Sequence, residues 1–238
     1  MNTFYISFDD TDNLDSPGTG HLLQNFLNSL VDQKTSYISR HQLFFSPDVP
    51  YTSHNSSMCS LVEGNIEYEE LIEKASQFLK DSLAEGADPG LCVADKSKLI
   101  FPELLVNWGY RAKKEVLSKR EAYELAKLCK VHLSEHGGTG QGVVGSLAGV
   151  GLRIAGQDGR VKGKKEVKKE AITVQELLMA TGFDRVVSYM DGELSDDVII
   201  HTDGNLIKAV YQNFQSTVLV TPEDGEYHLL SKDMIKCF

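Results

Sequence analysis

Apolar and polar positions along the first hundred residues follow the patterns of short strands and amphipathic helices. Alternating segments rich in β-branched and aromatic residues predict strands at residues 4–8, 37–45, 58–62 and 91–94. Apolar residues at helical spacing predict helices over 22–31 and 68–83. The resulting order, β-α-β-β-α-β, is that of the split βαβ arrangement. We therefore expect an α/β sandwich with helices on one face of its sheet.

The second half of the chain opens on a clear helix start. Ser118-Lys119-Arg120-Glu121 is a capping box, which predicts a helix running to about Glu135 and ended by Gly137. Small residues over 146–154 are typical of a closely packed helix or strand. The N-terminal domain is therefore expected at 1–112 and the C-terminal domain at 113–238, unless one is inserted in the other.

The tail of the chain predicts mainly strands. Asp158-Gly159 is a hairpin turn signal, and a second capping box at Thr173 opens a short helix that Gly182 ends. Strand patterns follow as a β meander at 198–201, 207–211, 217–220 and 227–230. The whole chain is thus expected to be a two-domain α/β (α+β) protein.

Composition places the chain among folded globular proteins, with 41% hydrophobic and 24% charged residues in 238. Its four cysteines lie far apart without a C-x-x-C pair, which excludes a readable zinc ribbon or disulfide framework and fits reduced thiols. The longest weakly polar run, 143–156, is Gly-rich, too short to span a membrane and interrupted by Arg153. We expect a cytoplasmic protein without a membrane partner.

Charge is unevenly distributed. The net charge of −10 disfavours a uniformly positive, nucleic-acid-binding surface. Residues 160–169 nevertheless hold six basic groups and one acidic group. The basic groups are Arg160, Lys162, Lys164, Lys165, Lys168 and Lys169. A solvated surface is one explanation of this run, and a phosphate or RNA contact is the other.

Three carboxylates lie within four residues at the end of the first predicted strand: Asp9, Asp10 and Asp12. They repel one another unless a cation or a hydrogen-bond donor lies among them. Such oxygen ligands suit Mg²⁺, which proteins usually hold with one or two carboxylates together with substrate phosphates. The alternative is an Asp-rich turn that caps the next helix and binds nothing.

The segment Pro17-Gly18-Thr19-Gly20 follows, directly before a predicted helix. Gly18 and Gly20 leave backbone N–H groups accessible, and a helix N-terminus attracts anions, so these glycines are candidate phosphate-binding residues. The hydroxyl of Thr19 would serve as metal ligand, phosphate donor or transient phosphoryl acceptor, with helix capping as the alternative. A Walker motif is absent, which excludes an ordinary P-loop enzyme.

Two further segments carry candidate residues. His54-Asn55 belongs to a polar loop that is long enough to reach over a site, and Asn55 is a candidate nucleotide contact. His132 and His136 have the spacing of a two-His metal face on the predicted helix, but no third ligand stands beside them, so an exposed helix end is favoured.

A Gly-rich segment completes the candidates, through Gly138, Gly140, Gly142 and Gly145. It contains a literal G-x-G-x-x-G, but it follows a predicted helix rather than a strand, which disfavours a nicotinamide site. Either these glycines provide positive φ angles and tight packing, or their amides form an anion nest for phosphate.

Four of these segments, in this order, resemble the N-terminal domains of the archaeal isoleucine-tRNA agmatinylcytidine synthetases. They are D-D-T-D at 9–12, the threonine at 19, Ser46–Asn55 as a variant of N-P-x-I-P-x-x-T-x-x-N, and 141–151 as a variant of R-G-V-I-G-A-L-A-A-I-G. The resemblance covers residues 4–156 and weakens beyond them. The OB-fold and the cysteine pairs of the family's zinc ribbon are lacking, and Gly18-Thr19-Gly20 replaces the family's C-T-T.

The resemblance implies a kinase-like domain accompanied by a ferredoxin-like domain. In that family the aspartates bind Mg²⁺ and ATP, and a cytidine oxygen is phosphorylated so that agmatine can displace it. By resemblance, Asp9, Asp10 and Asp12 hold Mg²⁺ and ATP phosphates, and Thr19 matches the threonine that becomes phosphorylated.

Our leading hypothesis is a Mg²⁺/ATP-dependent phosphotransferase or activating enzyme, similar to a kinase or ligase. Its acceptor is an RNA, a nucleotide or a small metabolite, and the sequence is compatible with a homodimer. The alternative is a nucleotide-binding or sensory module without turnover.

Overall fold

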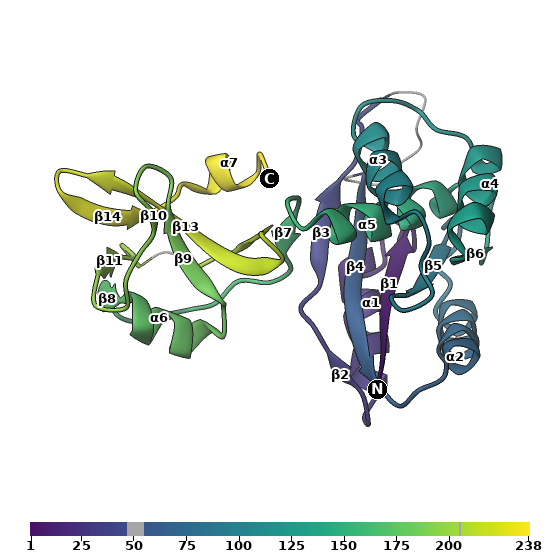
Figure 1. The fold of residues 1–238 in the computed structure, drawn as a ribbon, viewed down its shortest axis with the longest axis horizontal. Helices are drawn as coiled ribbons and strands as arrows, with labels where there is room; N and C mark the ends of the chain where they lie inside the picture. Colours follow the sequence, from purple (N-terminus) through teal and green to yellow (C-terminus); the bar gives the residue numbers. More distant parts are fainter. Residues whose placement is uncertain (47–54, 205) are drawn as a thin grey trace. The chain divides into compact units, whose positions relative to one another are not determined.

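The computed structural model describes residues 1–46, 55–204 and 206–238, which form two compact units, Met1–Ala155 and Gly156–Phe238 (Figure 1). We call them unit 1 and unit 2. The division falls at 155/156 rather than at the expected 112/113. The reason is that α5 (Gly142–Ala155) packs against α3 (Pro102–Ala112) and against the sheet of unit 1.

Unit 1 is built on an antiparallel sheet with β1 (Asn2–Asp9) at its centre. The order is β6-β5-β1-β4-β3, and β2 also pairs with β4. The other strands are β2 (Lys34–Thr35), β3 (Ser39–Gln42), β4 (Ser56–Gly64), β5 (Gly90–Asp95) and β6 (His132–Glu135). Helix α1 (Thr19–Ser29) follows β1, and α2 (Tyr68–Asp81) joins β4 to β5. The predicted β-α-β-β-α-β order and its split βαβ pairing are confirmed.

Helices cover both faces of this sheet (Figure 1). On one face, Phe4, Ile6 and Phe8 of β1 pack with residues of α1 and α2. On the other face, Tyr5 and Cys92 pack with residues of α3, α4 (Lys119–Cys129) and α5. The expectation of helices on one face is therefore corrected, because both sets of alternating side chains along β1 are buried.

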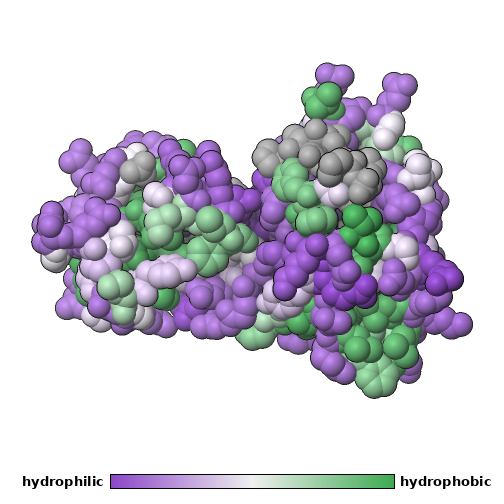
Figure 2. Space-filling model, turned by 90° about the horizontal axis from the view of Figure 1, so that it is seen from above, coloured by the Kyte–Doolittle hydropathy of each residue, from purple (hydrophilic) through white to green (hydrophobic). Residues whose placement is uncertain are grey.

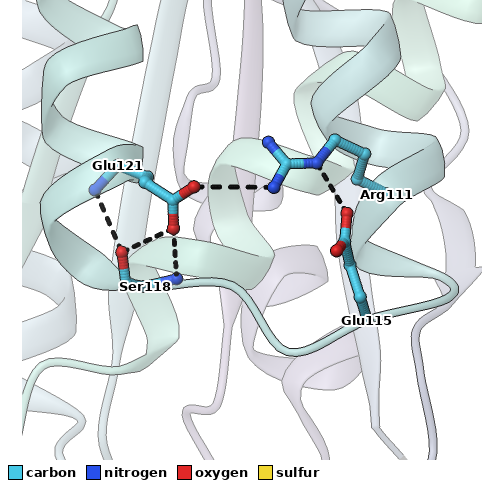
Figure 3. A network of polar contacts seen from close by, with 4 residues as sticks. All are labelled: Arg111, Glu115, Ser118 and Glu121. Atoms are coloured by element: carbon cyan, nitrogen blue, oxygen red, sulfur yellow. Dashed lines mark hydrogen bonds and ion pairs between the residues drawn. The ribbon is translucent and has the colours of Figure 1, made fainter.

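The capping box before α4 is confirmed, but the helix is shorter than expected (Figure 3). Ser118 Oγ accepts a hydrogen bond from the Glu121 amide at 3.3 Å, and Glu121 Oε2 accepts one from the Ser118 amide at 3.2 Å. Helix α4 ends at Cys129, because Lys130 takes the left-handed conformation and residues 132–135 pair with β5 as strand β6. The prediction of a helix to Glu135 was wrong.

Within its described residues, unit 2 consists mostly of short strands, with two short helices. The strands are β7 (Arg160–Val161), β8 (Ala171–Thr173), β9 (Arg185–Ser188), β10 (Gly192–Glu193), β11 (Ile199–His201), β12 (Val210–Gln212), β13 (Gln215–Glu223) and β14 (Glu226–Leu229). The helices are α6 (Val174–Thr181) and α7 (Lys232–Ile235). The capped start of α6 at Thr173 and its end at Gly182 are confirmed.

The strands of unit 2 are more than a meander. Consecutive antiparallel pairs join β12 to β13 and β13 to β14, as expected. However, β11 lies parallel to β14, and β9 lies parallel to β13. No hairpin forms at Asp158-Gly159, because the preceding residues belong to helix α5 rather than to a strand.

Candidate functional site

The acidic turn lies at the end of β1, the central strand of unit 1. Asp9 is the last residue of the strand and is 8% exposed. Asp10 takes the left-handed conformation, with φ of 52°, which is uncommon for a residue other than glycine. The Asp10 carbonyl accepts a hydrogen bond from the Asp88 amide at 3.0 Å, which ties the turn to the loop before β5. Two segments far apart in the chain therefore form one site.

Asp88 is a fourth carboxylate of this site, and the sequence patterns did not identify it as a candidate. Its carboxylate accepts hydrogen bonds from the Thr139 hydroxyl and the Gly140 amide. Its carbonyl accepts one from the Gly142 amide at 3.2 Å. Strand pairing explains why Asp88 lies beside the acidic turn. Strands β1 and β5 are antiparallel with Asp9 opposite Gly90, so the end of β1 meets the start of β5.

Burial and neighbouring carboxylates raise the pKa of two of these groups, Asp9 and Asp10. Burial, and then the charges of Asp10 and Asp12, raise the pKa of Asp9 well above its usual value, against a hydrogen bond from the Asp10 amide that lowers it. Burial and the charges of Asp88 and Asp12 raise the pKa of Asp10 to about 6. Neither shift has a contribution from a cationic side chain of the described residues. The site therefore favours a bound cation or protons.

Thr19 and the start of α1 complete this site. Thr19 Oγ1 donates to Asp12 Oδ1 at 3.0 Å, and the Thr11 amide approaches Thr19 Oγ1 at 3.4 Å. Thr19 is buried, and Gly18 precedes it as the N-cap without any side-chain cap. The acidic turn thus lies beside the N-terminus of a helix, as expected. Gly20 lies in the first turn of α1, where amide groups lack an intrahelical acceptor.

The glycines at the start of α5 allow close packing against the carboxylates. A Cβ at Gly145 would lie 1.8 Å from Asp9 Oδ2, and one at Gly142 would lie 2.3 Å from the Asp88 carbonyl oxygen. Gly138 and Gly140 have positive φ angles of 56° and 77°. The Gly140 amide is bound to the Asp88 carboxylate. These close approaches and φ angles fit the first of the two explanations, packing and backbone conformation.

The context of the G-x-G-x-x-G segment differs from the expected one. A strand, β6, precedes it rather than a helix, and α5 begins within it at Gly142. The arrangement is still not that of a dinucleotide-binding turn, because β6 pairs antiparallel with β5 and the described strands of unit 1 form no parallel βαβ unit here.

The remaining candidates lie in different settings. The side chain of Asn55, just before β4, donates to the carbonyl of Phe44, just after β3, at 2.7 Å, while His54 falls outside the described residues. His132 lies in β6 and His136 follows it, each 2.8 Å from Ser134 Oγ through Nε2. The expected position of both histidines on one helix was therefore wrong, because residues 132–135 form strand β6.

The carboxylates of the acidic turn could bind a divalent cation only together with further ligands from a substrate. Among the residues that the structure describes, no three His, Cys, Asp or Glu side chains are grouped to hold a metal ion by themselves. Asp9, Asp10 and Asp12 nevertheless offer oxygen donors that lack a cationic partner there. This matches the way proteins bind Mg²⁺, through one or two carboxylates with the substrate phosphates as further ligands.

No family model and no curated protein matches the chain. Solved structures do match its fold. The complex of TiaS with its tRNA and ATP is 21% identical with a TM-score of 0.56 over 73% of this chain and 39% of that chain. Apo TiaS, described as a tRNA agmatidine synthetase, is 20% identical with a TM-score of 0.55 over 72% and 38%. The complex of TiaS with tRNA, AMPCPP and agmatine is 17% identical with a TM-score of 0.55 over 81% and 49%.

These likenesses establish a shared fold with part of TiaS, which confirms the resemblance seen in the sequence at the level of structure. The chain spans less than half the length of the TiaS chains that it matches. All four cysteines are free, as expected. None of the helices within the described residues is both long and apolar enough to cross a membrane.

Proposed function

We propose that the protein is an ATP-dependent phosphotransferase or substrate-activating enzyme whose nucleotide phosphates bind at the acidic turn of unit 1. The observation that carries this proposal is the group of four carboxylates, from two loops, in which the raised pKa values of Asp9 and Asp10 have no cationic side chain to offset them. The group lies beside an uncapped helix N-terminus and a buried threonine hydroxyl. Those three features serve a metal, a phosphate and a phosphoryl-transfer step.

Asp10 and Asp12, with Asp9 behind them, would hold Mg²⁺ together with the phosphates of ATP. The ion, when bound, would neutralise phosphate charge. The protein's own contribution is to position the nucleotide, because phosphoryl transfer needs mainly alignment and charge stabilisation. Gly18 and Gly20 would let backbone amides approach the phosphates. Thr19, held by Asp12, would donate to a phosphate oxygen. Alternatively, its Oγ1 would accept the γ-phosphoryl group of ATP, with the hydroxyl proton passing to Asp12 and ADP leaving.

The phosphoryl acceptor is proposed from the neighbours. The TiaS structures hold tRNA together with ATP or AMPCPP. An RNA is therefore the first acceptor to test, ahead of a nucleotide or a small metabolite. Asn55, Gly138, Gly140, Gly142 and Gly145 remain proposed nucleotide contacts. In this role the glycines would shape the wall of the phosphate site, since two of them let α5 approach Asp9 and Asp88 closely.

The test is Mg²⁺-dependent ATP turnover in Asp10→Asn. We expect turnover to fall at least about a hundredfold, because one metal-binding carboxylate is removed from a site that acts through charge. Asp32→Asn is the matched control, since Asp32 is an exposed carboxylate of the same unit. ADP, AMP and pyrophosphate should all be measured, with RNA and metabolite extracts as acceptors.

The outcomes separate the hypotheses. Unchanged turnover in Asp10→Asn would remove the acidic turn from the mechanism. ATP binding by calorimetry with no product from any acceptor would favour the nucleotide-binding module over the enzyme.

A further inference from the structure

Unit 2 gathers lysines from distant parts of the chain at one place. Residues 170–238 contain twelve acidic groups and only three lysines: Lys208, Lys232 and Lys236. Lys232 and Lys236 both act electrostatically on Lys208, together with Arg160 and Lys164 of the basic run. We call these five residues the basic cluster. Positive charge is thus segregated within a unit that is acidic elsewhere.

Strand pairing brings the basic run to Lys208. Arg160 lies opposite Val210, and the Val161 amide donates to the Ala209 carbonyl at 2.9 Å. Further along, Lys165 and Ile207 form an isolated antiparallel bridge. Residues 160–165 therefore run antiparallel to 207–210, with Lys208 between the two points of pairing. Burial and the charges of Lys164, Arg160, Lys232 and Lys236 lower the pKa of Lys208.

The basic cluster is largely unneutralised. Lys236 forms an exposed ion pair with Asp233 at 2.9 Å. For Arg160, Lys164, Lys208 and Lys232, no carboxylate of the described residues forms such a pair. Lys169, from the same basic run, is by contrast paired with Glu176 at 2.8 Å. Like charges held together without counter-charges are unfavourable for folding, so their convergence indicates an anionic partner.

A cavity of about 290 Å³ opens beside the cluster. Lys208 and Lys232 lie in its wall with Ser231, and the rest of the lining is aliphatic: Leu206, Leu219, Leu229, Leu230 and Ile235. On the face shown in Figure 2, unit 2, at the left, likewise carries apolar side chains bordered by hydrophilic ones. An anion that also carries an apolar group would match such a site.

We propose that unit 2 binds RNA, with backbone phosphates on the basic cluster and one unstacked nucleotide at the aliphatic cavity. Several separated cations call for a polyanion rather than a single phosphate. Recognition of looped or single-stranded RNA commonly combines backbone contacts with a splayed-out base. An anionic membrane fits less well, because α7 has only four residues and cannot form an amphipathic surface helix. The proposal deepens the proposed function, on which its choice of RNA rests, by assigning the RNA partner to a separate surface.

The experiment measures RNA affinity by fluorescence anisotropy on the full chain, with a labelled hairpin RNA and without ATP or Mg²⁺, over a series of salt concentrations. Lys164→Glu/Lys232→Glu reverses two cluster charges. We expect its affinity to fall at least about tenfold, and the slope of log K against log salt to decrease by about 1.4 for two lost phosphate contacts. Lys162→Glu/Lys168→Glu is the control, since these lysines lie in the same run but are not among the charges acting on Lys208.

A second variant tests the cavity. Leu206 is 41% exposed and lies in the cavity wall, so Leu206→Trp should obstruct the opening without changing charge. We expect weaker RNA binding with an unchanged salt slope. An equal loss in the control double variant, or no loss in the cluster double variant, would overturn the proposal. So would equal or tighter binding of polyglutamate or of phosphatidylserine vesicles.

The two proposals can be tested independently of each other. Asp10→Asn should keep full RNA affinity, and the cluster double variant should keep ATP binding. RNA binding without ATP turnover would contradict only the proposed enzymatic function of unit 1. ATP turnover without RNA binding would contradict only the proposed role of the basic cluster.

Discussion

In α5, glycines lack the Cβ that would clash with neighbouring atoms, whereas in unit 2 glycines adopt the positive φ angles of turns. A Cβ at Gly151 would lie 1.9 Å from the Leu105 carbonyl oxygen, and one at Gly149 would lie 2.4 Å from Ser57 Oγ. Gly163 and Gly182 have φ of +100° and +71°, and a Cβ there would meet nothing within 4 Å. Glycine therefore serves dense packing in α5 and turn geometry at Gly163 and Gly182.

The difference shows how each unit builds its candidate site. In unit 1, tight packing of α5 against the sheet holds buried carboxylates together, so the site depends on the core. In unit 2, turns and short strands bring lysines together, so that site depends on the course of the backbone. Substitutions at the packed glycines of α5 should consequently have large effects, and substitutions at the open turn glycines of unit 2 small ones.

Gly151→Ala should have the largest effect. The new methyl group would meet the Leu105 backbone, which cannot rotate away, so α3 and α5 would have to separate. We expect a loss of about 3 kcal/mol in the free energy of unfolding, or failure to fold. Urea unfolding followed by Trp108 fluorescence measures it, because this single tryptophan is buried in unit 1. A loss below about 1 kcal/mol would contradict the packing explanation.

Asp10→Asn should act in the opposite direction. The pKa of Asp10 is raised to about 6 in the folded state, from a usual value of 3.8, so ionisation disfavours folding. The destabilisation is absent below the usual pKa, develops as the pH rises from about 4 to 6, and stays constant above. Asparagine also tolerates the left-handed conformation. With EDTA present, the variant should be more stable by about 1–2 kcal/mol at pH 8, allowing for solvent screening.

The measurement is urea unfolding at pH 4 and pH 8. The stabilisation should nearly vanish at pH 4, where the carboxyl is largely protonated in the folded state. A variant that is less stable than the wild type at pH 8 would show that Asp10 is not in an unfavourable electrostatic environment.

Gly182→Ala should have a smaller effect than either. The site has open space, so only the positive φ at the end of α6 opposes a side chain, and we expect a loss of about 1 kcal/mol. Amide hydrogen exchange in α6 should then be about fivefold faster, with exchange in α5 unchanged. A loss in the free energy of unfolding as large as that of Gly151→Ala would contradict the distinction between packed glycines and turn glycines.

Glu115→Gln should have the smallest effect. It removes the exposed ion pair between Glu115 and Arg111 (Figure 3), which screening limits to less than about 0.5 kcal/mol. Ser118→Ala, in the same connection between α3 and α4, should cost about 1 kcal/mol, because it breaks the capping box of α4. Urea unfolding at low and high salt checks both, and only the first should depend on salt.

Sequence patterns predicted β1, α1, β3, β4, α2 and β5 well, because each of these elements carries its own periodicity or turn signals, but they missed the short strand β2. They failed at residues 132–135, where the segment continues a helical pattern but pairs with β5. They also missed Asp88 as a site residue. Its neighbours Pro89 and Gly90 are sufficient to explain a turn, and nothing local indicates that the turn meets Asp10.

Local chemistry is enough to specify the order of elements in the split βαβ part, the capped starts of α4 and α6, and the acidic turn with its helix. Periodicity, capping and charge spacing all act within a few residues, so a linear pattern records them. Three features arise from folding alone. They are the placement of the fourth carboxylate, the packing of Gly145 on Asp9, and the gathering of Lys208, Lys232 and Lys236 near Arg160. They depend on antiparallel pairing and helix packing between segments that are tens of residues apart, which no local pattern encodes.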